Sequence, residues 1–274
     1  MIRQTLGFIG CGNMARSLIG GLIARGAKPQ QIIAADPAAS QREAVLAQFG
    51  VRATSSNAEV AAAAQVLVLA VKPQEMRTVA TGVEPAVRAH RPAILSVAAG
   101  IRSSDLQSWL GGLPVVRCMP NSPALNGCGV TGLFATAEAP QSHRDLAEEI
   151  MGAVGPAVWV EKESQMDAVT AVSGSGPAYF FLLIEMLEEA GVSLGLPPDV
   201  SRRLAIETAY GAGQMAHAAA ISPGDLRRQV TSKGGTTEAA VNSMEAAHMR
   251  KIFIAAVAAA AHRSAEMADQ FGKQ

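Results

Sequence analysis

Continuous apolar runs alternate with segments of helical periodicity along the chain up to residue 161. Runs such as 66–70, Val-Leu-Val-Leu-Ala, lack polar alternation and therefore predict strands that are buried on both faces. The alternation predicts an α/β fold, a Rossmann-type doubly wound parallel sheet with helices on both of its faces. The predicted strands cover residues 6–9, 31–35, 66–70, 94–97, 115–119, 127–135 and 157–160, and the predicted helices cover residues 13–25, 40–49, 58–63, 103–110 and 142–153, with one more after Pro73.

Small and polar residues follow several of the predicted strands. In a doubly wound sheet, ligands bind outside the carboxyl ends of the strands. We therefore expect the loops after these strands to form one crevice. They lie at Gly10, Asp36, Val71-Lys72-Pro73, Ala98 and Asn121.

The first predicted strand enters a helix through the pattern Gly10-x-Gly12-x-x-Ala15. Gly10 permits a tight turn, Gly12 lets a pyrophosphate approach the backbone, and Ala15 lets the helix pack close to the strand. The amides that begin the helix attract phosphate. This context predicts a bound dinucleotide, and a structural glycine-rich turn is the alternative.

The strand pattern stops after Glu161, and helices are predicted at residues 165–172, 178–190, 202–219, 237–247 and 249–270. Several of these helices are apolar nearly all round, so they need burial on most sides. We therefore predict a dinucleotide-binding domain, residues 1–161, and an all-helical domain, residues 162–274, through which two copies interlock. A monomer in which the first domain covers the helices is the alternative.

Two glycine-containing segments interrupt the helical half. Residues 230–238, Val-Thr-Ser-Lys-Gly-Gly-Thr-Thr-Glu, place hydroxyl side chains around two glycines before a helix. Backbone amides there can form a nest for a small carboxylate, and an ordinary helix start with Thr236 or Thr237 as N-cap fits equally well. Residues 172–179, Val-Ser-Gly-Ser-Gly-Pro-Ala-Tyr, allow either close approach to a cofactor or a helix break at Pro177.

The amino-acid composition argues against several functional classes, such as nucleic-acid-binding and metal-binding proteins. Of the 274 residues, 49% are hydrophobic and 17% charged, which leaves apolar surface for an oligomer interface. Basic and acidic residues number 23 each, so we expect neither nucleic acid nor a membrane as partner. Three cysteines and five histidines lack ligand spacing, so no metal site is expected. The start leaves no room for a signal peptide and residues 252–261 are too short to span a bilayer, so a cytoplasmic protein with reduced thiols is expected.

Six segments of the chain carry a resemblance to a known family. They are residues 10–15, 70–73, 97–100, 117–121, 172–179 and 230–240. In this order they resemble the motifs of Δ1-pyrroline-5-carboxylate reductases, and the resemblance covers essentially the whole chain. It implies the last step of proline biosynthesis, the NAD(P)H-dependent reduction of a cyclic imino acid, 1-pyrroline-5-carboxylate, to L-proline. It also implies a homodimer that can form a decamer of dimers, with the helical domain serving both dimerisation and substrate binding.

The resemblance further implies which residues form the site. Substrate and catalytic contacts fall on Ser232, Gly235, Thr236 and Thr237, near Thr170 and Glu163. Cofactor contacts fall on Gly10, Cys11, Gly12, Asn13, Met14, Ala15, Asp36, Asn57, Ala70, Val71, Lys72, Pro73, Val97, Ala98 and Ala99. Three residues depart from the family pattern: Lys233 stands where proline is frequent, Ala220 where some members have a glutamate, and Asp36 where many have a small or hydroxyl residue.

The implied reaction needs little acid–base help from the protein. A protonated imine already carries the positive charge that attracts hydride, and the product is a neutral amine, so positioning is the main task. β-Hydroxyacid dehydrogenases, a rival class with similar architecture, place a lysine on the helix after a glycine-rich segment. Here Tyr179 lies on that helix and no lysine lies between Lys162 and Lys233. Another imine reductase and a non-catalytic NADPH-binding regulator are the remaining alternatives.

The choice of cofactor depends on residues that follow the second predicted strand. The resemblance favours NADPH. A carboxylate at Asp36 usually accepts hydrogen bonds from the ribose hydroxyls of NADH and repels a 2′-phosphate. However, Pro37 can turn this carboxylate away, and Ser40 and Arg42 can offer a hydroxyl and a charge to the phosphate. We therefore predict that NADPH is preferred and that NADH is also used.

Overall fold

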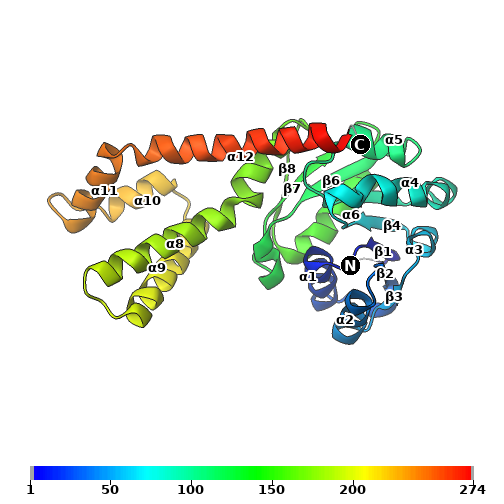
Figure 1. Cartoon of the computed structure of the whole chain (residues 1–274), viewed down its shortest axis with the longest axis horizontal. Coiled ribbons are helices and arrows are strands. Elements are labelled where there is room, and N and C mark those ends of the chain that lie inside the picture. The colour runs from blue at the N-terminus through cyan, green and yellow to red at the C-terminus, as the bar shows by residue number, and fades with distance from the viewer. Residues whose placement is uncertain (1–2, 273–274) are drawn as a thin grey trace. The chain divides into compact units, whose positions relative to one another are not determined.

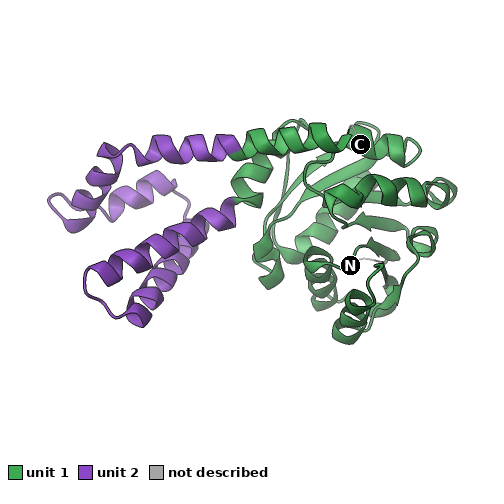
Figure 2. Cartoon of the chain, in the orientation of Figure 1, with its two compact units in different colours: residues 1–175, 260–274 green, residues 176–259 purple. Residues whose placement is uncertain are grey.

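The computed structural model describes residues 3–272, which form two compact units (Figures 1 and 2). The first unit comprises residues up to 175 together with those from 260 onward, and the second comprises residues 176–259. Residues 162–175 and 260–272, which the sequence pattern assigned to the helical domain, thus pack with the sheet. The division after residue 161 stays a prediction about folding units.

An eight-stranded sheet forms the centre of the first unit, in the order β3-β2-β1-β4-β5-β6-β7-β8. Its short apolar strands are almost fully buried at the centre, as the continuous apolar runs predicted. The strands are β1 Leu6–Ile9, β2 Ile32–Ala35, β3 Arg52–Thr54, β4 Val66–Leu69, β5 Ala93–Ser96, β6 Val115–Met119, β7 Thr131–Ala135 and β8 Ala157–Trp159.

The sheet is parallel from β3 to β6, but β7 runs antiparallel to β6. A parallel neighbour needs a crossover, usually an α-helix, whereas a short 3₁₀-helix, η2 Ser122–Asn126, connects these two strands. The chain therefore reverses between these two strands, whereas the predicted parallel sheet is confirmed from β3 to β6. Strand β3 is absent from the predicted elements because its three residues are at least partly exposed and carry no apolar run.

Helices cover both faces of the sheet, and alternate strand residues face opposite layers. Phe8 belongs to the core with Leu18 of α1, whereas Ile9 belongs to the core with Met76 of α4. The first layer also contains α2 and α6, and the second contains α3 and α5. These helices are α1 Asn13–Ala24, α2 Ala39–Phe49, α3 Asn57–Ala63, α4 Pro73–His90, α5 Ser103–Trp109 and α6 Gln141–Met151, with 3₁₀ turns η1 Pro29–Gln31 and η3 Gly152–Val154.

The last helix, α12 Met249–Gly272, ends within the first unit. Phe271 is buried among the residues of the second core layer. The Ser264 hydroxyl donates a 2.7 Å hydrogen bond to Asp167 of α7 Gln165–Val169, and Arg102 forms an ion pair with Asp269. These contacts explain why residues after 260 belong with the sheet.

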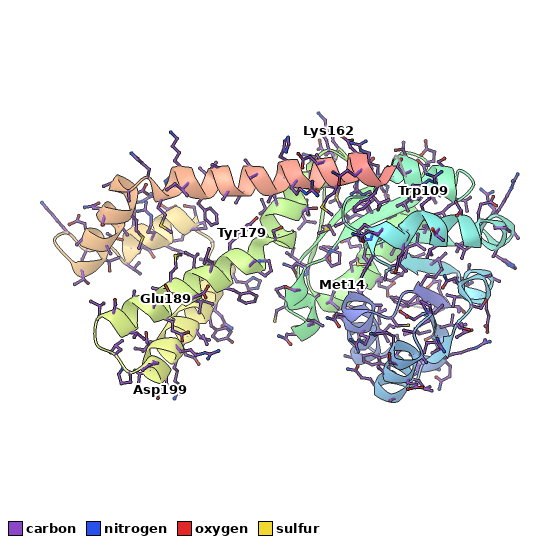
Figure 3. All side chains as sticks on the ribbon, in the orientation of Figure 1. Met14, Trp109, Lys162, Tyr179, Glu189 and Asp199 are labelled. Atoms are coloured by element: carbon purple, nitrogen blue, oxygen red, sulfur yellow. The ribbon has the colours of Figure 1, made fainter. Side chains whose placement is uncertain are left out.

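The second unit consists of helices alone. They are α8 Gly176–Ser193, α9 Pro198–Ala218, α10 Pro223–Gln229, α11 Thr236–Ala246 and the first part of α12. Helices α8 and α9 pack side by side (Figure 1). Tyr179 of α8 meets Phe253 of α12 edge to face, with 5.7 Å between ring centroids (Figure 3 labels Tyr179).

Few side chains of the second unit are covered within a single chain. Among residues 176–259, only Gly176, Ser201 and Ala205 are buried. Large apolar side chains are exposed to solvent, and Phe180 and Phe181 are each 65% exposed. One chain therefore leaves the apolar faces of these helices uncovered, which the all-round apolar pattern predicted.

One helical stretch, Gln165–Ser193, has the length and composition of a membrane span, with a mean hydropathy of 1.2 in its most apolar window. Only 11% of that window is buried. The stretch is divided by a π-helical turn, η4 Thr170–Gly174, between α7 and α8. Length and composition alone are weak grounds for a membrane span, since helices of soluble cores pass the same test.

Candidate functional site

The loops that follow β1, β2, β4 and β5 begin side by side at the carboxyl edge of the sheet. Backbone hydrogen bonds continue the ladder beyond the strands. The Gly10 amide donates to the Ala35 carbonyl at 2.7 Å, and the Ala70 amide donates to the Ile9 carbonyl at 2.8 Å. The Val97 amide likewise donates to Leu69 at 3.0 Å. Residues predicted to contact the cofactor therefore adjoin one another.

The residues of the pattern Gly10-x-Gly12-x-x-Ala15 form the tight turn that the sequence predicted. Gly10 has φ +98°, and a Cβ placed on it would lie 2.6 Å from the carbonyl oxygen of Ala70. Nothing lies within 4 Å of a Cβ placed on Gly12. Ala15, in the first turn of α1, is fully buried. The turn is thus closed on the side of Gly10 and open on the side of Gly12.

Helix α1 begins at this open side. Its N-cap is Gly12, which provides no side-chain cap, and its first turn contains no acidic residue. Met14 lies in that first turn (Figure 3). Uncapped amides together with the helix dipole form an anion-binding end of the kind that holds a pyrophosphate.

Asp36 is bound to backbone groups on both of its carboxylate oxygens. Oδ2 accepts from the Cys11 amide and Oδ1 from the Ala38 amide, each at 2.9 Å. Arg42 Nη1 donates to the carbonyls of Asp36 and Pro37, each at 2.8 Å. Burial, and then the charge of Asp36, raise the pKa of the Cys11 thiol to about 11. Asp36 thus holds the glycine turn, and Arg42 is fixed beside it.

The other residues predicted to contact the cofactor also lie at element ends in the first unit. Asn57 is the first residue of α3, whose N-cap Ser56 accepts from the Glu59 amide at 3.2 Å. Lys72 is the exposed N-cap of α4, and Pro73 is its first residue. Ala98 is buried, whereas Val71, Val97 and Ala99 are half-buried.

Glu163 is the centre of a hydrogen-bonded cluster. Its Oε1 accepts from the Ser103 amide at 2.6 Å and from Arg117 Nη1 at 2.7 Å, and its Oε2 accepts from the Ser103 hydroxyl at 2.7 Å. Burial acts to raise the pKa of Glu163, but the hydrogen bonds from Ser103 and Arg117 outweigh it and lower that pKa. The cluster joins the start of α5, strand β6 and the segment before α7.

Ser103 and Arg117 could not be recognised from the sequence as partners of Glu163. The signal was the single arginine within the otherwise apolar strand Val115–Met119. The side chain of Arg117 is only 8% exposed, and a buried charge needs a partner.

Thr170 begins the π-helical turn. Its hydroxyl donates to the Met166 carbonyl at 2.8 Å, and its own carbonyl accepts from the Ser175 amide at 2.8 Å. The side chain of Asn121, which follows β6, donates to the Ser173 carbonyl at 3.1 Å. Thr170 and Glu163 therefore lie in the first unit, on the chain that continues from β8 into the helices.

The remaining predicted contacts lie in the second unit, at the start of α11. The N-cap is Gly235, so the alternative in which Thr236 or Thr237 caps the helix is wrong. Gly234 has φ +72° and donates to Glu238 Oε2 at 2.7 Å, and the Gly235 amide donates to the Ser232 carbonyl at 3.0 Å. The hydroxyl residues Ser232, Thr236 and Thr237 are exposed around this glycine-rich helix start.

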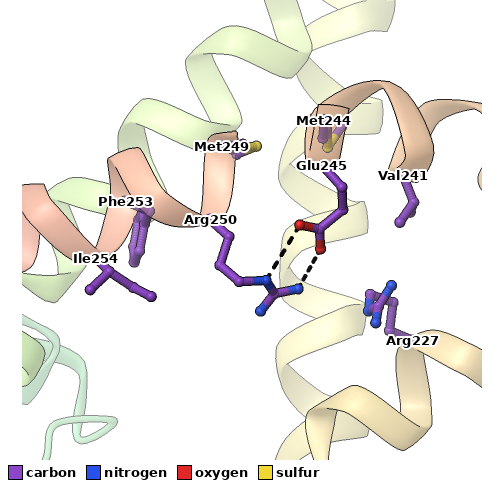
Figure 4. Close-up of a pocket in the computed structure, with 8 residues that line it drawn as sticks. All are labelled: Arg227, Val241, Met244, Glu245, Met249, Arg250, Phe253 and Ile254. Carbon is purple, nitrogen blue, oxygen red and sulfur yellow. Dashed lines mark hydrogen bonds and ion pairs between the residues drawn. The ribbon is translucent and has the colours of Figure 1, made fainter. Parts of the chain in front are cut away.

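A hollow of about 320 Å³ also lies in the second unit (Figure 4). It is lined by Arg227, Val241, Met244, Glu245, Met249, Arg250, Phe253 and Ile254. Glu245 forms an ion pair with Arg250 there. None of the residues predicted from the sequence lines it, and its walls are largely apolar side chains of α11 and α12.

Within residues 3–272, no three or more His, Cys, Asp and Glu side chains are grouped so that they could hold a metal ion. The three cysteines are free thiols, of which Cys128 is exposed.

Comparison with known proteins gives matches to both halves of the chain. Residues 163–267 match the model of the pyrroline-5-carboxylate reductase dimerisation domain, and residues 5–100 match a model of NADP oxidoreductases, coenzyme F420-dependent. A pyrroline-5-carboxylate reductase of Pseudomonas aeruginosa is 49% identical over 274 residues, with all of both chains covered. That of Haemophilus influenzae is 40% identical, with 99% of this chain and 100% of the relative covered.

Solved structures agree with these matches. A pyrroline-5-carboxylate reductase from Coxiella burnetii superposes with a TM-score of 0.93 at 38% identity, covering 97% of this chain and 99% of that one. The Plasmodium falciparum pyrroline carboxylate reductase, crystallised with NADP bound, superposes with a TM-score of 0.86 at 28% identity, covering 98% and 99%. With nearly half of its residues identical to a full-length relative, the chain belongs to the pyrroline-5-carboxylate reductase family, the NAD(P)H-dependent oxidoreductases of proline biosynthesis.

Proposed function

We propose that the chain reduces 1-pyrroline-5-carboxylate to L-proline with NADPH, and that the residues predicted from the sequence divide this task as follows. The turn from Gly10 to Ala15 and the start of α1 hold the pyrophosphate. The open space beside Gly12 and the uncapped helix end support this assignment. Lys72, Pro73 and residues 97–99 continue the same edge of the sheet and line the remainder of the cofactor. NADPH supplies the hydride when bound.

The surroundings of Asp36 support a preference for NADPH. Both of its carboxylate oxygens accept backbone amides, whereas a carboxylate that reads the ribose of NADH directs its oxygens to the ribose hydroxyls. Arg42 is anchored beside Asp36 by one nitrogen, and a guanidinium has further donors that suit a phosphate. NADH lacks that phosphate and is the weaker cofactor in this proposal.

The loop before α11 binds the carboxylate of the substrate. Amides at the start of a helix attract an anion, and no side chain caps this helix start. In this proposal the hydroxyls of Ser232, Thr236 and Thr237, which are exposed, orient the carboxylate, and Thr170 is assigned to the ring. Glu163 acts through the segment that carries Thr170, since its own oxygens are taken by Ser103 and Arg117.

The observation that carries the substrate proposal is the uncapped, hydroxyl-rich start of α11. Thr237→Ala is expected to raise the KM for 1-pyrroline-5-carboxylate about tenfold, the effect of losing one hydrogen bond to a charged group, with an unchanged Kd for NADPH. Thr231→Ala is the matched control, because the Thr231 hydroxyl donates to the Arg227 carbonyl instead. Equal effects of both variants, or a parallel loss of NADPH binding, would show that the loop has only a structural role.

Turnover separates this function from its alternatives. Loss of NADPH absorbance with 1-pyrroline-5-carboxylate is expected. Turnover with 3-hydroxyisobutyrate instead would indicate a β-hydroxyacid dehydrogenase, and turnover with neither would indicate a non-catalytic regulator. The same assay after EDTA treatment tests the expectation that no metal is required.

The helical half of the chain supports a homodimer, since residues 163–267 match a dimerisation domain and the apolar faces of residues 176–259 are exposed in one chain. A second copy would cover the apolar part of Gln165–Ser193 and the hollow beside Arg250. We further propose that the dimers assemble into a decamer and that the enzyme works in the cytoplasm, with no nucleic-acid or membrane partner. The balanced charge of 23 basic and 23 acidic residues supports the last point.

A further inference from the structure

The Ser173 carbonyl lacks the hydrogen-bond donor that an uninterrupted α-helix would give it. In an α-helix this carbonyl accepts from the amide four residues later. That residue is Pro177, which has no N–H and whose ring clashes with the carbonyl four residues before it. The sequence therefore requires another donor for Ser173, or a carbonyl that is left without a partner.

The backbone changes at this point of the helix, and a side chain supplies the donor. The helix widens into the π-helical turn Thr170–Gly174, closed by the 2.8 Å bond from the Ser175 amide to the Thr170 carbonyl. The side-chain amide of Asn121 then donates to the Ser173 carbonyl at 3.1 Å. Asn121 is 8% exposed, so this bond is shielded from water.

The position of Asn121 is fixed from its other end. Its Oδ1 accepts from the Val130 amide at 2.9 Å, so one amide group links the segment before β7 to the π turn. The donor and acceptor partners together define which atom of the amide is nitrogen. A Cβ on Gly174 would lie 2.7 Å from Met119 Cε, so the turn packs directly against the end of β6.

We propose that Asn121 is a positioning residue for the reduction. By supplying the donor that Pro177 lacks, it holds the π turn, and with it Thr170, at the carboxyl edge of the sheet. π-Helical turns are frequent at functional sites, and this one carries the residue assigned to the substrate ring. The inference rests on the proposed function for the role of Thr170.

The test replaces the donor of Asn121 and retains its size. Asn121→Asp keeps an acceptor for the Val130 amide but turns an oxygen toward the Ser173 carbonyl. We expect the KM for 1-pyrroline-5-carboxylate to rise about tenfold, as for the loss of one shielded hydrogen bond, with the Kd for NADPH within about twofold of the parent. Asn126→Asp, an exposed residue of the same loop, is the matched control and should leave both constants unchanged.

A second background shows whether the hydrogen bond itself is responsible. Pro177→Ala restores an N–H at residue 177, which can donate to the Ser173 carbonyl. In that background the effect of Asn121→Asp on KM is expected to shrink to about threefold or less, because the carbonyl has a second donor. If Asn121→Asp does not fold, Asn121→Ser is compared in the same two backgrounds.

The outcomes are distinct. No turnover of the imine by the unmodified enzyme contradicts the proposed function. Turnover by that enzyme with an unchanged KM in the Asn121 variants contradicts only the role of Asn121. Equal effects with and without Pro177, or a rise in the Kd for NADPH that matches the rise in KM, also contradict the role of Asn121 and leave it as a general structural contact.

Discussion

A Cβ on Gly10 would lie 2.6 Å from the carbonyl oxygen of Ala70, so the turns after β1 and β4 meet backbone to backbone. The φ of +98° at Gly10 adds a second reason why no side chain fits there. Gly12, two residues later, has nothing within 4 Å of the same hypothetical atom. The two glycines of one motif therefore differ in their surroundings: Gly10 is enclosed by the fold, and Gly12 is open on the side of its missing side chain.

Substitution by alanine should separate the roles of these two glycines. Gly12→Ala is expected to keep the melting temperature and to weaken NADPH binding by about tenfold or more, because its methyl group occupies space that the pyrophosphate needs. Gly10→Ala is expected to destabilise the fold by about 1–3 kcal/mol or more, from backbone strain together with the contact to Ala70. Calorimetry and NADPH titration measure both. A Gly12→Ala variant that melts as early as Gly10→Ala would contradict this division.

The Glu163 cluster makes a prediction about pH. Because the hydrogen bonds of Ser103 and Arg117 lower the pKa of Glu163 in the folded state, its stabilising effect is fully present above the unfolded value of 4.5 and is lost as pH falls through the lower folded value. Glu163→Gln should therefore lose most stability near neutral pH and progressively less in acid. Denaturant unfolding of both proteins across pH 3–7, an interval of about four units around that value, gives the difference. A difference that does not change with pH would show that the carboxylate charge is unimportant.

Much of the first unit could be predicted because its strands are buried on both faces and its turns require glycine. Gly10 and the apolar run Val66–Leu69 carry that information locally. The reversal at β7 could not be derived in the same way, since an apolar strand has the same pattern in either direction. The length of the link from Met119 to Thr131, with its short 3₁₀-helix, was the missed signal.

The site was predictable to different degrees for a similar reason. Motif residues such as Gly12 and Gly235 can be recognised from the short sequence patterns around them, because each pattern reflects a local backbone conformation. Partners such as Ser103 and Glu163 lie 60 residues apart, and no local pattern joins them. The ending of α12 against the sheet depends equally on distant contacts, such as the bond from Ser264 to Asp167, 97 residues apart.

The exposed faces of the helical unit predict an obligate dimer. Sedimentation velocity at low concentration should show no folded monomer, because a single chain leaves side chains such as Phe180 open to water. Phe180→Asp should shift the protein toward monomer and lower its stability. Leu46 of α2 in the first unit is also apolar and is 54% exposed, so Leu46→Asp is the control and should remain dimeric. A fully active, stable monomer would rule out the obligate dimer.

Arg42 and Asp36 should act differently on the choice between NADPH and NADH. If Arg42 contacts the 2′-phosphate, Arg42→Ala should lower kcat/KM with NADPH about tenfold and leave kcat/KM with NADH nearly unchanged, since only NADPH carries that charge. Asp36→Ser should lower kcat/KM with both cofactors together, because the Asp36 carboxylate holds the Cys11 amide and thus the glycine turn common to both. Steady-state kinetics of the parent and the two variants with each cofactor decide the matter. A parent that prefers NADH, with a ratio that Asp36→Ser shifts toward NADPH, would mean that the carboxylate reads the ribose after all. In that event the hydrogen bonds from Cys11 and Ala38 would have to give way when the cofactor binds.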